Sequence, residues 1–326
     1  MKDITISRRS LLVSAGLLAL APLAGCGGNS GSGSAAAGSD YTIGVLQLTE
    51  HSALDAANDG FVKAIKKSGL KVKIDQKNAQ NDQSTCKSIA DKFVGDGVDL
   101  IYAIATPAAQ AAAGATADIP IVGCAITDYA ASGLVQDNDK PGTNVTGASD
   151  LTPVAEQLEM MQKVLPDVKK IGLLYCTAES NSDVQIKAAK KELDKLDLEY
   201  TDFTVSSSNE IQSVVESAVG KVDALYSPTD NTIAAGASQV GQICKENKLP
   251  YVTGEEGMCM AGGLFTLSIN YEDLGYAAGE MAVKILKGEA KPEEMPIKHL
   301  SSKDLVVVKN DEMAEALGID LSALDE

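Results

Sequence analysis

The sequence has no tryptophan, only four phenylalanines and only two histidines. Two histidines make a Ser-His-Asp triad or a histidine-rich metal site difficult to assemble. Basic residues are also scarce, because 28 lysines and arginines stand against 45 aspartates and glutamates, for a formal charge of −17. Phosphate backbones and anionic lipid surfaces repel a body of this charge. The composition therefore argues against nucleic-acid binding.

Common catalytic motifs are missing as well. The sequence contains no GxSxG, no GxxxxGK[ST], no HExxH and no GxGxxG after a strand-like run. Paired carboxylates in a cleft can still act as acid and base, so this absence alone does not exclude catalysis. We nevertheless interpret the chain as a binding protein without a cofactor.

The cysteines give no metal-site spacing. Five remain once Cys26 is assigned to the export signal described below, and none forms a CxxC pair: Cys86, Cys124, Cys176, Cys244 and Cys259. Two of them, Cys124 and Cys176, lie in apolar runs typical of strands, where a buried thiol behaves as a small hydrophobic group. We predict no metal site and expect free thiols, although one disulfide stays open. Free thiols would suit a weakly oxidising exterior.

The first 26 residues resemble an export signal. The basic pair Arg8-Arg9 precedes an apolar stretch over 11–23 that is short for a membrane span. The stretch ends in Leu23-Ala24-Gly25-Cys26, the pattern at which prolipoproteins are cleaved before a lipid-modified cysteine. We predict a signal peptide over 1–25, lipidation of Cys26 and a flexible Gly/Ser linker over 26–40. The export route stays open, because arginine pairs occur in twin-arginine signals and in ordinary ones.

From Tyr41 onward, apolar runs of strand length alternate with segments of helical period. The first half predicts strands over 41–48, 72–74, 99–104 and 120–124, and helices over 52–68, 82–95 and 107–114. The second half predicts strands over 171–175, 199–203, 224–227 and 251–253, and helices over 153–165, 182–196, 209–220 and 231–247. Strands buried on both faces and joined by helices form a parallel, doubly wound α/β sheet.

The two halves are similar to each other. Residues 98–107 contain a Val-Asp pair, an apolar run that ends in tyrosine and a proline that opens an alanine-rich helix. The same order of features occurs over residues 222–228. The turn formers of Pro141 to Gly147 break the alternation between the halves. We therefore predict two similar lobes.

Polar residues gather at the predicted strand ends, where open parallel sheets bind ligands. Free N–H groups of helix N-termini suit a carboxylate there, and side-chain carboxylates suit an ammonium group. The same residue types are ordinary helix caps. Ser52 and Ser182 fit capping best, whereas Asp230 and Glu50 are explained less well by capping alone. The two histidines carry little signal.

Several segments, taken in order, resemble the solute-binding lipoproteins of ABC transporters in the periplasmic-binding-protein type I superfamily, and within them the tryptophan- and tyrosine-binding group. These segments are 43–56, 105–110, 141–147, 171–175, 179–182, 226–231, 271–279 and 310–318. The resemblance implies two Rossmann-like lobes joined by a three-crossover hinge. Lobe 1 would comprise 41–148 plus 268–300, and lobe 2 would comprise 149–267 plus 301–326.

The same resemblance implies a function. It implies an extracytoplasmic, lipid-anchored monomer that closes on an amino-acid-like ligand and delivers it to an ABC permease with its ATPase, without catalysis. An aromatic amino acid is favoured, but Tyr226 and Tyr271 can both be core residues, and a smaller zwitterion fits the composition as well. A ligand-sensing lipoprotein without transport and a tethered enzyme are the alternatives.

Carried over turn by turn, the resemblance also implies a ligand site. Asp230 would pair with the ammonium group of the ligand, and Thr106 and Ser182 would contact its carboxylate. The full candidate set is Thr49, Glu50, Thr106, Asp128, Asn181, Ser182, Asp230, Glu255 and Tyr271.

Overall fold

The computed structural model describes residues 40–299 and 301–325. The predicted signal peptide, Cys26 and the linker up to residue 39 lie outside this part of the chain. The described residues belong to one compact unit. Among its described helices, none combines the length and apolar character that a membrane crossing requires.

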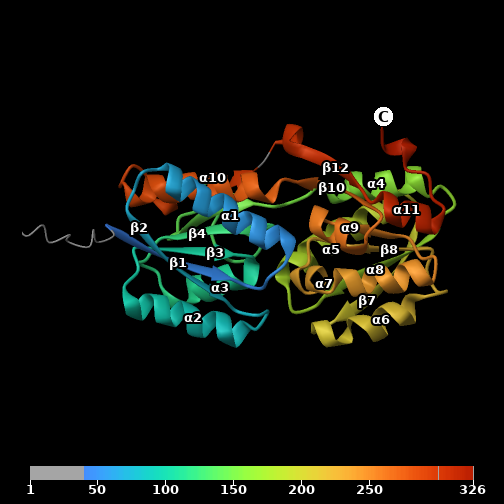
Figure 1. Cartoon of the computed structure of the whole chain (residues 1–326), viewed down its shortest axis with the longest axis horizontal. Coiled ribbons are helices and arrows are strands. Elements are labelled where there is room, and N and C mark those ends of the chain that lie inside the picture. Colours follow the sequence, from blue (N-terminus) through green and yellow to red (C-terminus); the bar gives the residue numbers. More distant parts are fainter. Residues whose placement is uncertain (1–39, 300, 326) are drawn as a thin grey trace, which may run out of the picture. The chain divides into compact units, whose positions relative to one another are not determined.

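The first lobe is built on a six-stranded sheet with the order β11-β5-β4-β3-β1-β2. Strands β1 to β4 of this sheet are labelled in Figure 1. Every neighbouring pair in the sheet is parallel. Every residue of β3, β4 and β5 is buried, as expected for a sheet covered on both faces. The strands are β1 Tyr41–Gln47, β2 Val72–Asn78, β3 Leu100–Ile104, β4 Ile121–Ile126, β5 Val145–Ser149 and β11 Lys298–His299.

Helices cover both faces of this sheet. Helices α1 (Ser52–Lys67) and α10 (Tyr271–Leu286) lie side by side on one face, and α2 (Gln83–Asp96) and α3 (Thr106–Ala115) lie on the other (Figure 1). The α1–α10 contact is close, since a Cβ at Gly60 would lie 1.9 Å from the Glu272 carbonyl oxygen. A late helix is thereby fixed to the first lobe.

The second lobe has a four-stranded parallel sheet with the order β7-β6-β8-β9. Successive residues of β6 point to opposite faces of the sheet and belong to different apolar clusters. Leu173 is in the cluster of Leu158 and Phe265, whereas Leu174 is in the cluster of Ile211 and Val240. The strands are β6 Lys170–Cys176, β7 Glu199–Val205, β8 Ala224–Ser227 and β9 Tyr251–Thr253. The helices are α4 Val154–Val164, α5 Ser180–Lys195, α6 Ile211–Ala218, α7 Asn231–Ala235, α8 Ala237–Glu246, α9 Glu256–Gly262 and α11 Asp311–Leu317.

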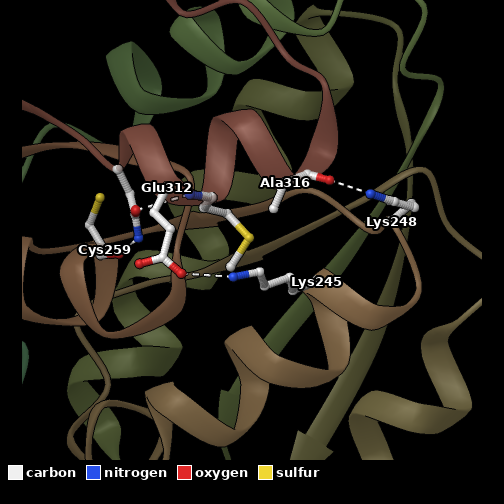
Figure 2. Close-up of polar contacts among 7 residues, drawn as sticks. Lys245, Lys248, Cys259, Glu312 and Ala316 are labelled. Carbon is white, nitrogen blue, oxygen red and sulfur yellow. Dashed lines mark hydrogen bonds and ion pairs between the residues drawn. The ribbon is translucent and has the colours of Figure 1, made fainter.

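Helix α11 docks on the second lobe through polar contacts at both of its ends (Figure 2). At the first turn, Glu312 pairs with Lys245 of α8 at 2.7 Å. At the last turn, Lys248 donates to the Ala316 carbonyl oxygen. The Asn310 side chain caps α11 and also donates to the Cys259 carbonyl oxygen at 3.0 Å. The C-terminal helix is therefore tied to α8 and α9.

Three segments connect the lobes. The first runs from β5 to α4, the second from β10 (Phe265–Ile269) to α10, and the third from β11 to β12 (Leu305–Lys309). Strands β10 and β12 pair antiparallel, which links the second and third connections beside the second lobe. This is the hinge of a two-lobed α/β protein.

Most elements occur where the sequence predicts them, but the turn-former run over 141–147 was interpreted wrongly. Its second half begins β5, whose residues are all buried. Gly147 is needed there as a close-packing residue, because its φ is +151° and a Cβ would lie 2.1 Å from the Gly123 carbonyl oxygen. The glycine that indicates a turn in the sequence instead allows β4 and β5 to approach each other.

Other corrections concern the second lobe. The helix predicted over 231–247 is two helices, which meet at Gly236. Helix α9 and strand β10 were not predicted. The predicted capping roles were also wrong, because α1 and α5 have no side-chain cap bond at their N-termini, whereas Asp230 does cap α7.

Candidate functional site

A small polar cavity lies where the two lobes meet, at the carboxyl ends of the strands. Its volume of about 10 Å³ is room for about one water molecule. Residues from the first lobe, the hinge and the second lobe line it together: His51, Leu54, Ala125, Thr127, Asp150, Asn181, Thr229, Asp230, Asn231, Ala234, Glu255 and Tyr271.

Four of the nine predicted ligand-binding residues line this cavity, namely Asn181, Asp230, Glu255 and Tyr271. The structure therefore brings together candidates that are far apart in sequence. Their contact with a ligand stays a prediction.

The other five candidates are not among the lining residues. Thr49 and Thr106 are buried, and Glu50 is exposed. The Asp128 carboxylate accepts from the Ala131 N–H and from Asn138, both at 3.0 Å. The Ser182 hydroxyl donates to Asp230 at 2.7 Å. Asp128 and Ser182 thus already have protein partners.

Sequence reasoning did not select five polar lining residues: His51, Thr127, Asp150, Thr229 and Asn231. Each one lies next to a predicted strand end or at the predicted first crossover. For all of them except Asp150 a neighbour in sequence was chosen instead, since residue type alone does not show which side chain at a turn faces inward. The hydrogen-bond contacts described below supply that information.

Three buried carboxyl groups line the cavity. Burial raises the pKa of Asp150 to about 6 and the pKa values of Asp230 and Glu255 to about 7, and the charge of nearby Glu179 adds to the rise for Asp230. No lysine is among the lining residues, and the sequence after Arg9 contains no arginine. The cavity is therefore rich in acceptors and has no protein cation of its own.

Two of these carboxyl groups also cap helices. Asp230 accepts from the Ile233 N–H at 2.9 Å at the start of α7, and its second oxygen accepts from the Cys176 N–H at 2.6 Å and from Ser182. Glu255 accepts from the first N–H groups of α9, at 2.5 and 2.6 Å. The bonds of Asp150 are longer, to the hydroxyls of Tyr271 at 3.0 Å and Thr127 at 3.4 Å.

A fourth buried carboxylate, Glu179, organises the lobe-2 wall. One of its oxygens accepts from the Thr232 N–H and hydroxyl, both at 2.8 Å. The other accepts from the side-chain amides of Asn231 at 2.6 Å and Asn181 at 3.1 Å. Glu179 therefore fixes the orientation of two cavity-lining amides.

Hydrogen bonds cross from one lobe to the other around the cavity. His51 Nε2 lies 3.3 Å from Asn231 Oδ1, and Asn81 Nδ2 donates to Thr232 Oγ1 at 3.0 Å. Gln185 of α5 also reaches the Thr127 hydroxyl at 3.3 Å. The lobes are thus closed on each other.

Among the described residues, no group of three or more His, Cys, Asp and Glu side chains is arranged to hold a metal ion. The five described cysteines are buried and make no disulfide. Burial raises the pKa of each thiol, to about 11 for Cys86 and Cys176 and to about 12 for Cys124, Cys244 and Cys259. These thiols are consequently poor nucleophiles at neutral pH.

Comparison with known proteins identifies relatives over nearly the whole chain. A family model described as ABC transporter substrate binding protein matches residues 42–323. The tyrosine-binding protein of Clostridioides difficile (strain R20291) is 40% identical over 324 residues, which cover 96% of this chain and 93% of that protein.

Two solved structures of relatives differ in how well they superpose on this chain. An ABC domain in complex with L-Trp from Streptococcus pneumonia is 41% identical, with a TM-score of 0.85 over 88% of this chain and 98% of that chain. A ligand-free, open substrate-binding protein with adhesive properties from Clostridium difficile is 46% identical, but its TM-score is 0.65 over 86% of this chain and 95% of that chain. The present structure therefore superposes better on a ligand-bound relative than on an open one of higher identity.

Proposed function

The chain belongs to the family of ABC transporter substrate-binding proteins, and from this premise we propose that it captures tyrosine or tryptophan between its lobes and delivers it to a permease. One relative of 40% identity is named a tyrosine-binding protein, and another of 41% identity was solved with L-Trp. A ligand that carries an α-ammonium group is the feature common to both.

The observation that carries the proposal is the acceptor-rich cavity. Asp150, Asp230 and Glu255 line it without a lysine or arginine. Burying a carboxylate is unfavourable unless a partner compensates its charge. An ammonium group supplies that charge together with three N–H donors. Asp230 stays our candidate partner, since it lines the cavity and its three hydrogen bonds leave one of the about four acceptor positions of a carboxylate for the ligand.

The carboxylate end of the ligand requires donors. Thr106 stays a candidate, because its hydroxyl is buried without a hydrogen-bond partner at the start of α3. Ser182 suits this role less well, because its hydroxyl already donates to Asp230. Thr49, Glu50 and Asp128 stay proposals on the strength of the family resemblance alone.

Binding requires the cleft to open. A cavity of about 10 Å³ is much smaller than the several hundred Å³ of a typical ligand site. We infer that lobe 1 (41–148 plus 268–300) and lobe 2 (149–267 plus 301–326) separate about the three connecting segments and close again around the ligand. The cross-lobe bonds of His51 and Asn81 would then form only in the closed protein, which is the state that a permease reads.

Membrane attachment is the last part of the proposal. The Leu23-Ala24-Gly25-Cys26 pattern supports cleavage after residue 25 and lipidation of Cys26, and residues 26–40 would act as a tether. The protein would work outside the cytoplasm as a monomer. Globomycin-sensitive processing and metabolic labelling with a fatty acid, both lost in Cys26→Ala, are the expected results.

Calorimetric titration of residues 38–326 tests the ligand assignment. We expect binding of L-Tyr or L-Trp and much weaker binding of the matching analogues that lack the amino group, 3-(4-hydroxyphenyl)propanoate and 3-(indol-3-yl)propanoate. L-Leu and glucose serve as controls for side-chain and ligand class. Equal affinity for an amino acid and its desamino analogue would contradict the role assigned to the cavity.

A further inference from the structure

Hydrogen-bond chemistry fixes the orientation of the Asn231 amide. The Glu179 carboxylate lies 2.6 Å from Asn231 Nδ2 and can only accept in its ionised form. The group that faces Glu179 must therefore be the NH₂ group of Asn231. The amide oxygen is then the atom that faces His51 across the lobe interface.

This orientation also fixes the tautomer of His51. Because Asn231 Oδ1 is an acceptor, His51 Nε2 must carry the hydrogen in their 3.3 Å contact. Burial lowers the pKa of His51, which favours the neutral ring. A neutral ring with hydrogen on Nε2 has a bare lone pair on Nδ1.

Nδ1 is left without a partner in the protein. Although the ring keeps partial exposure, the Nδ1 atom itself is buried and makes no hydrogen bond. The same is true of Asn181 Oδ1, because the NH₂ group of Asn181 donates to Glu179 and to the Thr229 carbonyl oxygen, both at 3.1 Å. Both residues line the cavity. An unpartnered buried acceptor is unfavourable by itself and calls for a donor.

We propose that His51 Nδ1, with Asn181 Oδ1 beside it in the cavity lining, accepts N–H hydrogen bonds from the ammonium group of the ligand. His51 is thereby a specificity residue contributed by the first lobe, and Asn231 and Glu179 are positioning residues contributed by the second. The inference rests on the proposed function, and it adds to it a link between recognition and closure. Nε2 reaches Asn231 only when the lobes meet, so closure orients the ring that reads the ammonium group.

Two substitutions separate the two ring nitrogens. Glutamine places its amide near the position of Nε2, so His51→Gln keeps a donor for Asn231 and loses the Nδ1 acceptor. Asparagine places its amide near Nδ1, so His51→Asn keeps an acceptor for the ligand and loses the contact with Asn231. His299→Gln changes the exposed second histidine and is the matched control.

Calorimetric titration of residues 38–326 with L-Tyr and L-Trp supplies the first test. A hydrogen bond to a charged group contributes enough for His51→Gln to weaken binding by roughly tenfold or more. We expect His51→Asn to bind more tightly than His51→Gln, and His299→Gln to match wild type. Binding of His51→Gln within twofold of wild type, or tighter than His51→Asn, would overturn the inference and leave the proposed function standing. If wild type bound neither amino acid, the proposed function would fall and the inference with it.

Nitrogen NMR of ¹⁵N-histidine-labelled wild type is the second test, and it requires no variant. With only two histidines in the chain, the His51 signals can be assigned by comparison with His51→Gln. In the complex with L-Tyr or L-Trp, we expect Nε2 to appear as a protonated nitrogen and Nδ1 as an unprotonated nitrogen that accepts a hydrogen bond. Hydrogen on Nδ1 in the complex would refute the assignment.

Discussion

Asp150 provides a direct test of how buried carboxyl groups affect stability. It lies at the first hinge crossover and is 5% exposed, and its carboxylate accepts side-chain hydrogen bonds from the hydroxyls of Tyr271 and Thr127. A hydroxyl can donate or accept, so an asparagine at this position keeps partners for both of its side-chain atoms. Asp150→Asn therefore removes the buried charge without leaving a polar group unpaired.

The sign of the effect follows from linkage between protonation and folding. Burial raises the pKa of Asp150 from 3.8 to about 6 in the folded protein, so the folded state binds the proton more tightly than the unfolded state does. The contribution to stability is fully present below pH 3.8 and is lost as the pH rises through 6. This rise in the pKa of Asp150 corresponds to about 3 kcal/mol of folding free energy, since each pKa unit corresponds to about 1.4 kcal/mol.

Asparagine does not titrate, so Asp150→Asn escapes this loss. We expect the free energy of unfolding of the variant, relative to that of wild type, to be higher at pH 8 than at pH 4 by about 2–3 kcal/mol. Urea unfolding of the ligand-free protein at several pH values measures it, with the exposed Asp118→Asn as the control. A difference between variant and wild type that does not change with pH would refute the reasoning.

Three further predictions follow from the same structure. Affinity for an ammonium ligand should rise between pH 5 and pH 8, because protons must leave Asp230 and Glu255, whose pKa values are about 7. Titrations in buffers of different ionisation enthalpy should show this proton release, and an affinity that does not change with pH would contradict the prediction. Asp230→Ala should weaken ligand binding by about 2–5 kcal/mol in calorimetry, whereas Asp118→Asn on the exposed surface should not. Gly147→Ala should lower the thermal midpoint strongly, because its Cβ would lie 2.1 Å from a carbonyl oxygen, whereas Gly95→Ala has open space and should be neutral or stabilising.

The sequence was sufficient to predict the fold because both lobes follow a strong local pattern. Buried apolar runs such as Leu100–Ile104 and Ala224–Ser227 have the length of strands and lie between segments of helical period, which favours a strand. The pattern is weaker where tertiary contact decides the structure. Gly147 indicates a turn locally but lies within a strand, and Gly236 divides a helix whose apolar period runs through it. The comparisons confirm the family assignment made from the ordered motifs.

The sequence predicts which strand-to-helix turns surround the site, but not which side chains of those turns line the cavity. Strand ends identify where the cavity lies, yet Thr127 lines it and its neighbour Asp128 does not. The side-chain direction at such a turn depends on backbone angles that the residue names do not contain. Asp230 illustrates a second difficulty, since it is both a helix cap and a cavity wall, and the two roles were weighed as alternatives.

The arrangement of charge explains why ligand binding and closure belong together. Glu179, Asp230 and Glu255 all come from lobe 2, so closing the lobes removes water from three carboxyl groups at once. Without a cation this dehydration opposes closure, and the raised pKa values of Asp230 and Glu255 express the same opposition. An ammonium group reverses the balance, because it compensates the charge in the closed protein more than in the open one. Such differential affinity is the only means by which a ligand can shift the population between two states. We therefore expect an analogue of the ligand that lacks the ammonium group to leave the lobes open even where its ring still binds. Small-angle scattering with 3-(indol-3-yl)propanoate and L-Trp would distinguish the two outcomes, and equal compaction by both would contradict the electrostatic account.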